Sequence, residues 1–268
     1  MKIGLITDIH YGLLRKFMGE NRGDGSDALD RLPSLLENMK RQGVETIVNL
    51  GDNLSAQGRN SDRKRLGRLY DVFERSGIPT FYVLGNHECT TMHKDDAKLI
   101  LRMPNYYYSV NFGTEKLVFL DAQDGSCPGE VDVFQMEWLK QELSNCNNAY
   151  VFVHQSLAEP DLSNNPWFRS GPSGGKIKNR EDVRTILEDS GKVDVVVNGH
   201  LHQNRLQIIN DISYLTVNSW SEFGILGKRD ETYGILETPK NECYIPCFGK
   251  NEIHKDKTLI EYLSCLGC

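Results

Sequence analysis

The chain has 268 residues, of which 39% are hydrophobic and 25% charged, and this length suffices for one large globular domain or two small ones. The formal net charge of −6, from 31 basic and 37 acidic residues, argues against nucleic acid or an anionic membrane as a partner. The first apolar run ends at the charged residue Asp8 and is too short for the apolar region of a signal peptide. No later run is long enough to span a bilayer, so we expect neither a signal peptide nor a membrane span.

Apolar runs rich in β-branched residues alternate with helical patterns over the first 200 residues. The expected strands are KIGLIT (2–7), VETIVNL (44–50), TFYVL (80–84), KLVFL (116–120), AYVFV (149–153) and VDVVV (193–197). The helical patterns between them cover residues 26–42, 61–76, 95–102, 133–145 and 180–190. Ser26 and Ser61 stand where the caps of the first two helices are expected.

The last third of the chain reads as short strands separated by turn residues: RLQIIN (205–210), ISYLTVN (212–218), YGILET (233–238) and CYIPCF (243–248). No repeat or linker divides the sequence. We therefore expect one α/β domain over residues 1–268, built from two packed sheets with helices outside. The strands within 203–268 are expected to complete the second sheet.

The seven cysteines are an odd number, which fits free thiols in a reducing compartment and predicts a cytoplasmic protein. Four of them end the chain as a C-x3-C and a C-x2-C pair: Cys243, Cys247, Cys265 and Cys268. This spacing permits a structural zinc site. Free thiols, buried in the core or exposed, are the simpler explanation, because the first pair lies in a strand-like run.

Two segments, residues 11–25 and 156–178, are rich in Gly, Asn, Ser or Pro and are expected to be long loops that form the walls of a site. Trp167, Phe168 and Trp220 lie in or after loops, where they would either cover the site or pack in the core. Three arginines, Arg22, Arg59 and Arg169, are either contacts to a negatively charged group of a ligand or ordinary surface residues.

Side chains able to bind a metal follow one strand after another. They are Asp8, His10, Asp52, Asn86, His87, His154, His200 and His202. Ligand sites in α/β sheets gather at the carboxyl ends of strands, so these side chains are expected to meet. A set of carboxylate, imidazole and amide ligands without thiolate suits Mn, Fe or Zn. Asp52 has two carboxylate oxygens and could bridge two ions about 3.5–4 Å apart.

Five short motifs resemble, in order, those of the calcineurin-like metallophosphoesterase family. They are D-x-H at 8–10, G-D-N at 51–53, G-N-H-E at 85–88, His154 and G-H-x-H at 199–202. The resemblance implies a four-layer αββα sandwich of two mixed β-sheets flanked by helices. It also implies two sets of metal ligands that share one residue: Asp8, His10, Asp52 and His202 for one ion, and Asp52, Asn86, His154 and His200 for the other.

The same resemblance implies a hydrolase with two divalent metal ions. A metal-bridging hydroxide would attack phosphorus, and His87 would act as the acid or charge stabiliser beside the phosphate. Asn53 and Asp194 are candidates for orienting the ligands, although turn or surface roles explain both equally well.

The run GDNLSAQG, residues 51–58, lacks the Asp-Arg pair that protein phosphatases of the family carry. The pattern resembles more the class III cyclic-nucleotide and glycerophosphodiester phosphodiesterase group. We therefore expect a phosphodiesterase that acts on a small soluble phosphoester, with nucleotide-like compounds among the candidates. The alternatives are a small-molecule phosphomonoesterase or nucleotide pyrophosphatase of the same fold and, from another class, a non-catalytic metal-binding interaction subunit.

Overall fold

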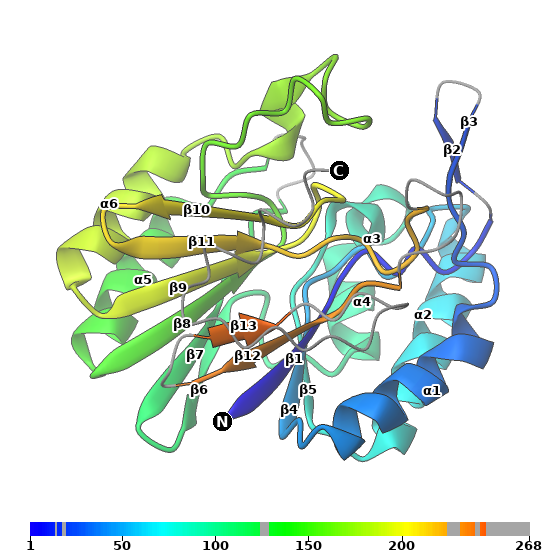
Figure 1. Cartoon of the computed structure of the whole chain (residues 1–268), viewed down its shortest axis with the longest axis horizontal. Helices are drawn as coiled ribbons and strands as arrows, with labels where there is room; N and C mark the ends of the chain where they lie inside the picture. The colour runs from blue at the N-terminus through cyan, green and yellow to red at the C-terminus, as the bar shows by residue number, and fades with distance from the viewer. Residues whose placement is uncertain (14, 18–19, 124–128, 224–230, 239–241, 245–268) are drawn as a thin grey trace.

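The computed structural model describes residues 1–13, 15–17, 20–123, 129–223, 231–238 and 242–244. Two large β-sheets lie face to face between two pairs of helices (Figure 1). Helices α1 (Ala28–Arg41) and α2 (Arg59–Ser76) cover one outer face, and α5 (Val133–Ser144) and α6 (Arg180–Ser190) cover the other. The predicted four-layer sandwich is therefore confirmed.

The first sheet has the strand order β13-β12-β1-β4-β5. Its strands are β1 (Lys2–Ile6), β4 (Thr46–Asn49), β5 (Thr80–Tyr82), β12 (Gly234–Glu237) and β13 (Glu242–Tyr244). Strands β1, β4 and β5 run parallel, whereas β12 is antiparallel to β1 and to β13. The prediction that every strand beyond residue 203 joins the second sheet is thus wrong for β12 and β13, because β12 pairs with the free edge of β1.

The second sheet has the order β10-β11-β9-β8-β7-β6. Its strands are β6 (Tyr108–Phe112), β7 (Glu115–Phe119), β8 (Asn148–Val153), β9 (Val193–Asn198), β10 (Arg205–Ile209) and β11 (Ile212–Thr216). The four central strands are parallel, and β6 and β10 pair antiparallel at the edges. Both sheets are mixed, as predicted.

Alternate side chains of β8 separate two layers of core. Tyr150 and Phe152 pack between the sheets, where the ring of Phe152 stacks on that of Phe119 with centroids 5.3 Å apart. Val151 and Val153 point the other way, into the cluster that α5 and α6 cover. Because full burial of one such side chain contributes about 1.5–3 kcal/mol, the period-two pattern of this strand holds the inner layers of the sandwich together.

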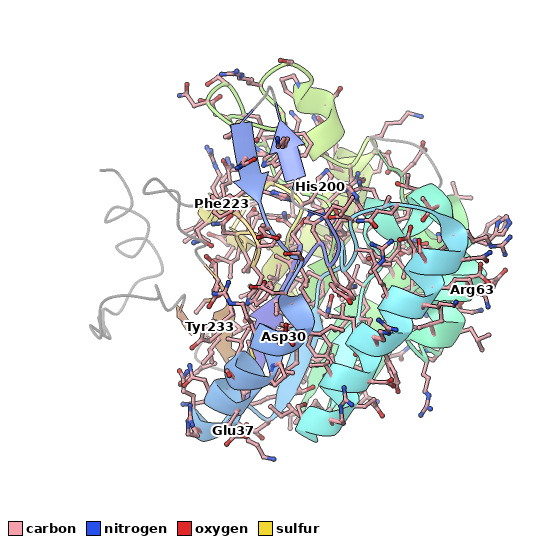
Figure 2. All side chains as sticks on the ribbon, turned by 90° about the vertical axis from the view of Figure 1, so that its right-hand side faces the viewer. Asp30, Glu37, Arg63, His200, Phe223 and Tyr233 are labelled. Atoms are coloured by element: carbon pink, nitrogen blue, oxygen red, sulfur yellow. The ribbon has the colours of Figure 1, made fainter. Side chains whose placement is uncertain are left out.

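The predicted loop 11–25 is partly wrong, because it contains a hairpin of β2 (Arg15–Phe17) and β3 (Glu20–Gly23). Segment 156–178 is largely irregular, as predicted, with one 3₁₀ turn at Pro172–Gly175. The hairpin and this segment project beyond the sheets on the same side of the molecule (Figures 1 and 2). Two short helices, α3 (Asn86–Thr91) and α4 (Lys94–Ile100), follow β5.

Neither predicted helix cap is correct. The cap positions of α1 and α2 are Asp27 and Gly58, and the Ser61 hydroxyl donates to the Gly58 carbonyl at 2.8 Å. Within the described residues, no helix combines the length and apolarity needed to cross a membrane.

The start of α2 is held by Asp62, whose buried carboxylate also contacts α3. It accepts hydrogen bonds from the backbone N–H groups of Gln57 and Gly58 at 2.9 Å each, from the Thr91 hydroxyl at 2.5 Å and from Arg65 at 2.7 Å. Burial alone would raise the pKa of this carboxyl, but the donors, Thr91 first, lower it below its ordinary value.

We expect Asp62→Asn to lower the free energy of unfolding by about 1–3 kcal/mol at pH 7, because an amide cannot accept from all these donors. The folded-state pKa lies below the unfolded value, so the carboxylate stabilises the fold above about pH 4 and loses this effect as pH falls further. The difference between variant and wild type, measured by urea unfolding, should therefore shrink toward acid. A difference that stays constant across pH would contradict this account, and Asp71→Asn, at an exposed position of α2, is the matched control.

Candidate metal centre

The parallel strands of both sheets end at the same edge of the sandwich, and the predicted ligands meet there. Asp8 and His10 follow β1, Asp52 follows β4, and Asn86 opens α3 after β5. From the second sheet, His154 follows β8, and His200 and His202 follow β9. Possible ligand atoms lie within 4.8 Å of one another in three groups: Asp8, His10 and His202; Asp52, His154 and His200; and His10, Asp52 and His87.

The backbone at these strand ends is unusual. Five of the residues have φ in the left-handed region, between 48° and 66°: Asp8, His10, Asp52, His200 and His202. L-amino acids with a Cβ avoid this region, and each such residue costs of order 1–3 kcal/mol. Several strained residues at one place are typical of a functional site. Here the left-handed backbone conformation directs the side chains inward from the ends of the strands.

Asp52 occupies the middle of the centre. One carboxylate oxygen, Oδ1, accepts the backbone N–H of His87 at 2.8 Å. The other, Oδ2, lies 3.4 Å from Nε2 of His154 and 3.9 Å from Nε2 of His10. A single oxygen therefore lies between the two sets of ligands. Burial alone would raise the pKa of Asp52, but His154 and then His87 bring it well below its ordinary value.

Asp8 has the same arrangement. Its Oδ2 accepts hydrogen bonds from the Thr7 hydroxyl at 2.6 Å and from the backbone N–H of His200 at 2.8 Å. Its Oδ1 faces Nε2 of His202 at 3.1 Å and Nε2 of His10 at 3.5 Å. Each carboxylate thus has one oxygen anchored by donors and one directed at the imidazoles.

The outer nitrogens of two histidines identify their tautomers. Nδ1 of His154 contacts the Leu50 carbonyl at 2.7 Å, and Nε2 of His200 contacts the Gly174 carbonyl at 3.0 Å. A carbonyl only accepts, so both outer nitrogens carry protons. When both rings are neutral, the inner nitrogens face each other as two lone pairs only 3.1 Å apart, a repulsion that a proton on His154 relieves when no metal ion is bound. A cation between them relieves this repulsion, so the donor set fits a divalent metal ion.

The electrostatics of the site also favour a cation. Burial and the neighbouring His154 lower the pKa of His200 to about 4. Burial would lower the pKa of His154 too, but the Asp52 carboxylate outweighs it and raises the pKa to about 9. Asp52 therefore attracts positive charge strongly enough to overcome the full burial of an imidazole.

His87 differs from the other imidazoles of the centre. Its side chain is 35% exposed, whereas that of His154 is fully buried. Nε2 of His87 lies 3.9 Å from Oδ2 of Asp52, and its ring meets that of His10 edge to face with centroids 4.7 Å apart. His87 therefore lies on the solvent side of Asp52, within reach of anything bound there.

Glu88 joins two of the motifs, a role that the sequence reading missed. Its buried carboxylate accepts backbone N–H groups of Gly85 at 2.8 Å, Asp52 at 3.0 Å and Asn53 at 2.6 Å. Burial and then repulsion from Asp52 raise the pKa of Glu88 to about 7. The sequence places Glu88 within its motif, but its three donors come together only in the folded chain. Asn53 is linked to the centre through this backbone contact.

Two aromatic side chains lie over the centre. The half-buried ring of Trp167 meets that of His202 with centroids 5.2 Å apart, and Phe168 meets His200 at 4.9 Å. Trp220 is instead 1% exposed and belongs to the core, the alternative that the sequence left open for all three.

Other candidates lie away from the centre. Asp194 is exposed on β9, so the suggestion that it orients a ligand is wrong. Arg59 forms an ion pair with Asp96 of α4, and the side chain of Arg22 lies outside the described residues. Cys243 packs against the core from β13. The remaining three cysteines of the terminal set lie outside the described residues: Cys247, Cys265 and Cys268.

Comparison with known proteins identifies similar chains. The family model described as calcineurin-like phosphoesterase matches residues 1–204. A 3′,5′-cyclic-nucleotide phosphodiesterase of Nostoc is 24% identical over 219 residues, which cover 80% of this chain and 76% of the relative. Among solved structures, a dimetal phosphatase from Danio rerio has a TM-score of 0.70 at 16% identity, covering 87% of this chain and 91% of its own. GAP50, the anchor in the inner membrane complex of Plasmodium, has a TM-score of 0.58 at 18% identity, covering 100% and 95%.

Gly85 offers a test of how closely the backbone approaches Asp52. A Cβ at Gly85 would lie 2.2 Å from Oδ1 and 2.3 Å from the backbone nitrogen of Asp52. We therefore expect Gly85→Ala to displace the Asp52 carboxylate and to weaken Mn²⁺ binding at least about tenfold, a loss of about 1.4 kcal/mol. The measurement is a titration of metal-free protein with Mn²⁺.

Gly67→Ala is the matched control, because a Cβ at this position of α2 meets nothing within 4 Å. It should keep the Mn²⁺ affinity and raise the free energy of unfolding by about 0.5–1 kcal/mol, since Ala favours the helix over Gly. Wild-type Mn²⁺ affinity in Gly85→Ala would show that the placement of Asp52 does not govern metal binding.

Proposed function

The chain belongs to the calcineurin-like phosphoesterase family, and on that premise we propose that it hydrolyses small soluble phosphodiesters with the help of two divalent metal ions. The observation that carries this proposal is the position of Asp52 Oδ2, which lies between an imidazole of each ligand set. One carboxylate oxygen shared in this way suits two ions rather than one.

The proposed ligand sets share Asp52. Asp8, His10 and His202 complete the first set, and their inner atoms converge within 4.8 Å. Asn86, His154 and His200 complete the second. Here Oδ1 of Asn86 lies 3.1 Å from Nε2 of His154, which supports the amide as a ligand. Oxygen and imidazole nitrogen donors together suit Mn, Fe or Zn.

When bound, the two ions would neutralise the charge of the phosphoester and lower the pKa of water toward neutrality. The chain supplies the rest of the chemistry. The anchored oxygens of Asp8 and Asp52 keep the two carboxylates from turning, so that their free oxygens stay directed inward. His87, the exposed imidazole of the centre, would donate a proton or hydrogen bond to the leaving oxygen.

Two observations support a diester substrate. The relative from Nostoc is named as a 3′,5′-cyclic-nucleotide phosphodiesterase and matches over 76% of its length. The run from Gly51 to Gly58 carries no arginine, and Arg59, the next residue, bonds Asp96 instead. A phosphate monoester dianion gains from several basic contacts, whereas a diester carries one charge and an extra organic arm. Trp167 and Phe168 lie where they could contact that arm.

A single domain over 1–268 and a cytoplasmic location are part of the proposal and stay predictions. The first rests on the absence of any linker-like tract in the sequence, and the second on the odd, scattered set of cysteines.

The proposal is tested by comparing kcat/KM for bis(p-nitrophenyl) phosphate, p-nitrophenyl phosphate and a cyclic nucleotide on the same Mn²⁺-loaded protein. Diester hydrolysis should at least equal monoester hydrolysis, and elemental analysis should find two ions per chain. A monoester preference of a hundredfold, about 2.7 kcal/mol, would favour a phosphomonoesterase. Hydrolysis of neither class would favour a non-catalytic interaction subunit, which need not hold two ions.

His87→Ala should keep both ions and lower kcat by about 10²–10⁴-fold, the usual contribution of a general acid. The loss should be smaller for nitrophenyl substrates, whose leaving group departs without a proton, than for a cyclic nucleotide. His93→Ala changes an exposed histidine six residues away and should leave both rates unaltered. Loss of an ion in His87→Ala would instead move His87 into the ligand set with His10 and Asp52.

A further inference from the structure

Glu222 lies where three separate parts of the chain meet, beyond the region that the family model matches. Its side chain is buried, and the two carboxylate oxygens have different partners. Oε2 accepts a hydrogen bond from Nδ1 of His202 at 2.7 Å, and Oε1 accepts one from the indole nitrogen of Trp167 at 3.1 Å. Its backbone forms an isolated bridge with Gly23 at the end of β3.

The bond to His202 fixes which nitrogen of that ring carries the proton. A carboxylate accepts at Nδ1, so a neutral ring that binds a metal ion has its proton on Nδ1 and its lone pair on Nε2. Nε2 is the atom that lies 3.1 Å from Asp8 Oδ1 and 3.2 Å from Nε2 of His10, in the first ligand set. A carboxylate behind an imidazole also makes its other nitrogen a stronger metal ligand.

The bond to Trp167 connects the wall of the site to the same carboxylate. The indole ring already meets the ring of His202, with centroids 5.2 Å apart. Asn165 strengthens this connection, because its Oδ1 accepts the backbone N–H of Trp167 at 2.9 Å and its Nδ2 donates to the Leu201 carbonyl at 2.7 Å. The stretch that carries Trp167 is therefore attached to both His202 and the turn before it.

The residues just before Glu222 support Asp8. The hydroxyls of Ser219 and Ser221 both donate to the Asp8 carbonyl, at 2.8 Å and 3.1 Å. Asp8 is one of the residues in the left-handed region, so these bonds hold a strained backbone in place. Segment 219–222 thus contacts two members of the first ligand set from outside.

We propose that Glu222 is a positioning residue that holds His202 for one of the two metal ions and joins the wall bearing Trp167 to that ligand. A change at Trp167 should then alter the metal affinity of His202, and a change at His202 should alter the position of Trp167, because both side chains bond the same carboxylate. This inference rests on the proposed function, because it concerns the ligands of the first ion.

The test uses the full chain freed of metal, with Mn²⁺ as the titrant. Glu222→Ala should weaken one of the two Mn²⁺ sites about 10–100-fold and leave the other near its wild-type affinity. Glu222→Gln keeps one acceptor oxygen and should recover part of the loss. Trp167→Phe keeps a ring over His202 but removes the indole donor. Combined with Glu222→Ala, it should add less than its own separate effect, because both act through one carboxylate.

Glu130→Ala is the control, since Glu130 is 40% exposed and pairs with Lys178. It should leave both Mn²⁺ sites unchanged. Equal weakening of both ions by Glu222→Ala, or losses that multiply independently in the double variant, would overturn the inference.

The tautomer of His202 in the metal-free protein provides a second readout that needs no activity. Nitrogen NMR should find a proton on Nδ1 of His202 in the wild type. In Glu222→Ala part of this proton population should move to Nε2, which faces Asp8 Oδ1 at 3.1 Å. A purely structural role for Glu222 would lower stability without changing the tautomer. A wild-type His202 without a proton on Nδ1 would overturn the inference. A wild type that has this proton but binds no Mn²⁺ would overturn the proposed function and leave the positioning of His202 standing.

Discussion

The structure of the site depends on two buried carboxylates, Asp8 and Asp52, whose negative charges must be compensated by the groups around them. Asp8 is fully buried and Asp52 is 2% exposed, and a buried negative charge is costly unless positive charge and hydrogen bonds compensate it. Each carboxylate meets this demand in two ways, with one oxygen bonded to backbone or hydroxyl donors and the other directed at imidazoles. Although burial opposes it, the pKa of His154 rises to about 9 beside Asp52, which indicates how strongly the site attracts a cation.

The residues at the strand ends adopt a strained backbone conformation that directs their side chains into the site. Asp8 and Asp52 both have left-handed φ values, and so do three of the histidines. The surrounding hydrogen bonds offset this strain. Glu88 accepts the backbone N–H of Asp52, and Ser219 and Ser221 donate to the carbonyl of Asp8. At about 1–3 kcal/mol for each of the five residues, the strain before this compensation is of order 5–15 kcal/mol, which the extensively buried core and the surrounding hydrogen bonds must offset.

The parts of the chain outside the family motifs determine what surrounds the centre. The hairpin β2–β3, the segment that carries Trp167 and the residues after β11 come together at Glu222. The motif residues would bind the metals and the phosphate. We therefore expect selectivity for the organic part of the substrate to depend on these outer segments, and on Trp167 and Phe168 in particular.

Periodicity predicted most of the strands and the polar side chains at their ends, and the resemblance of the motifs to a known family predicted the four layers and the ligand sets. Apolar runs such as VVV at 195–197 end abruptly in polar side chains, and parallel strands of one sheet end at one edge, so Asp8 and Asp52 are expected to be neighbours. The packing of the second sheet on the first decides that His200 joins them. The pairing of β12 with β1 could not be predicted, because a short apolar strand fits either sheet equally well. Nor could the contact of Glu222 with His202 and Trp167, 20 and 55 residues away in the chain. Side chains in irregular segments have no period, and only the folded backbone decides which donors and acceptors come within reach of one another.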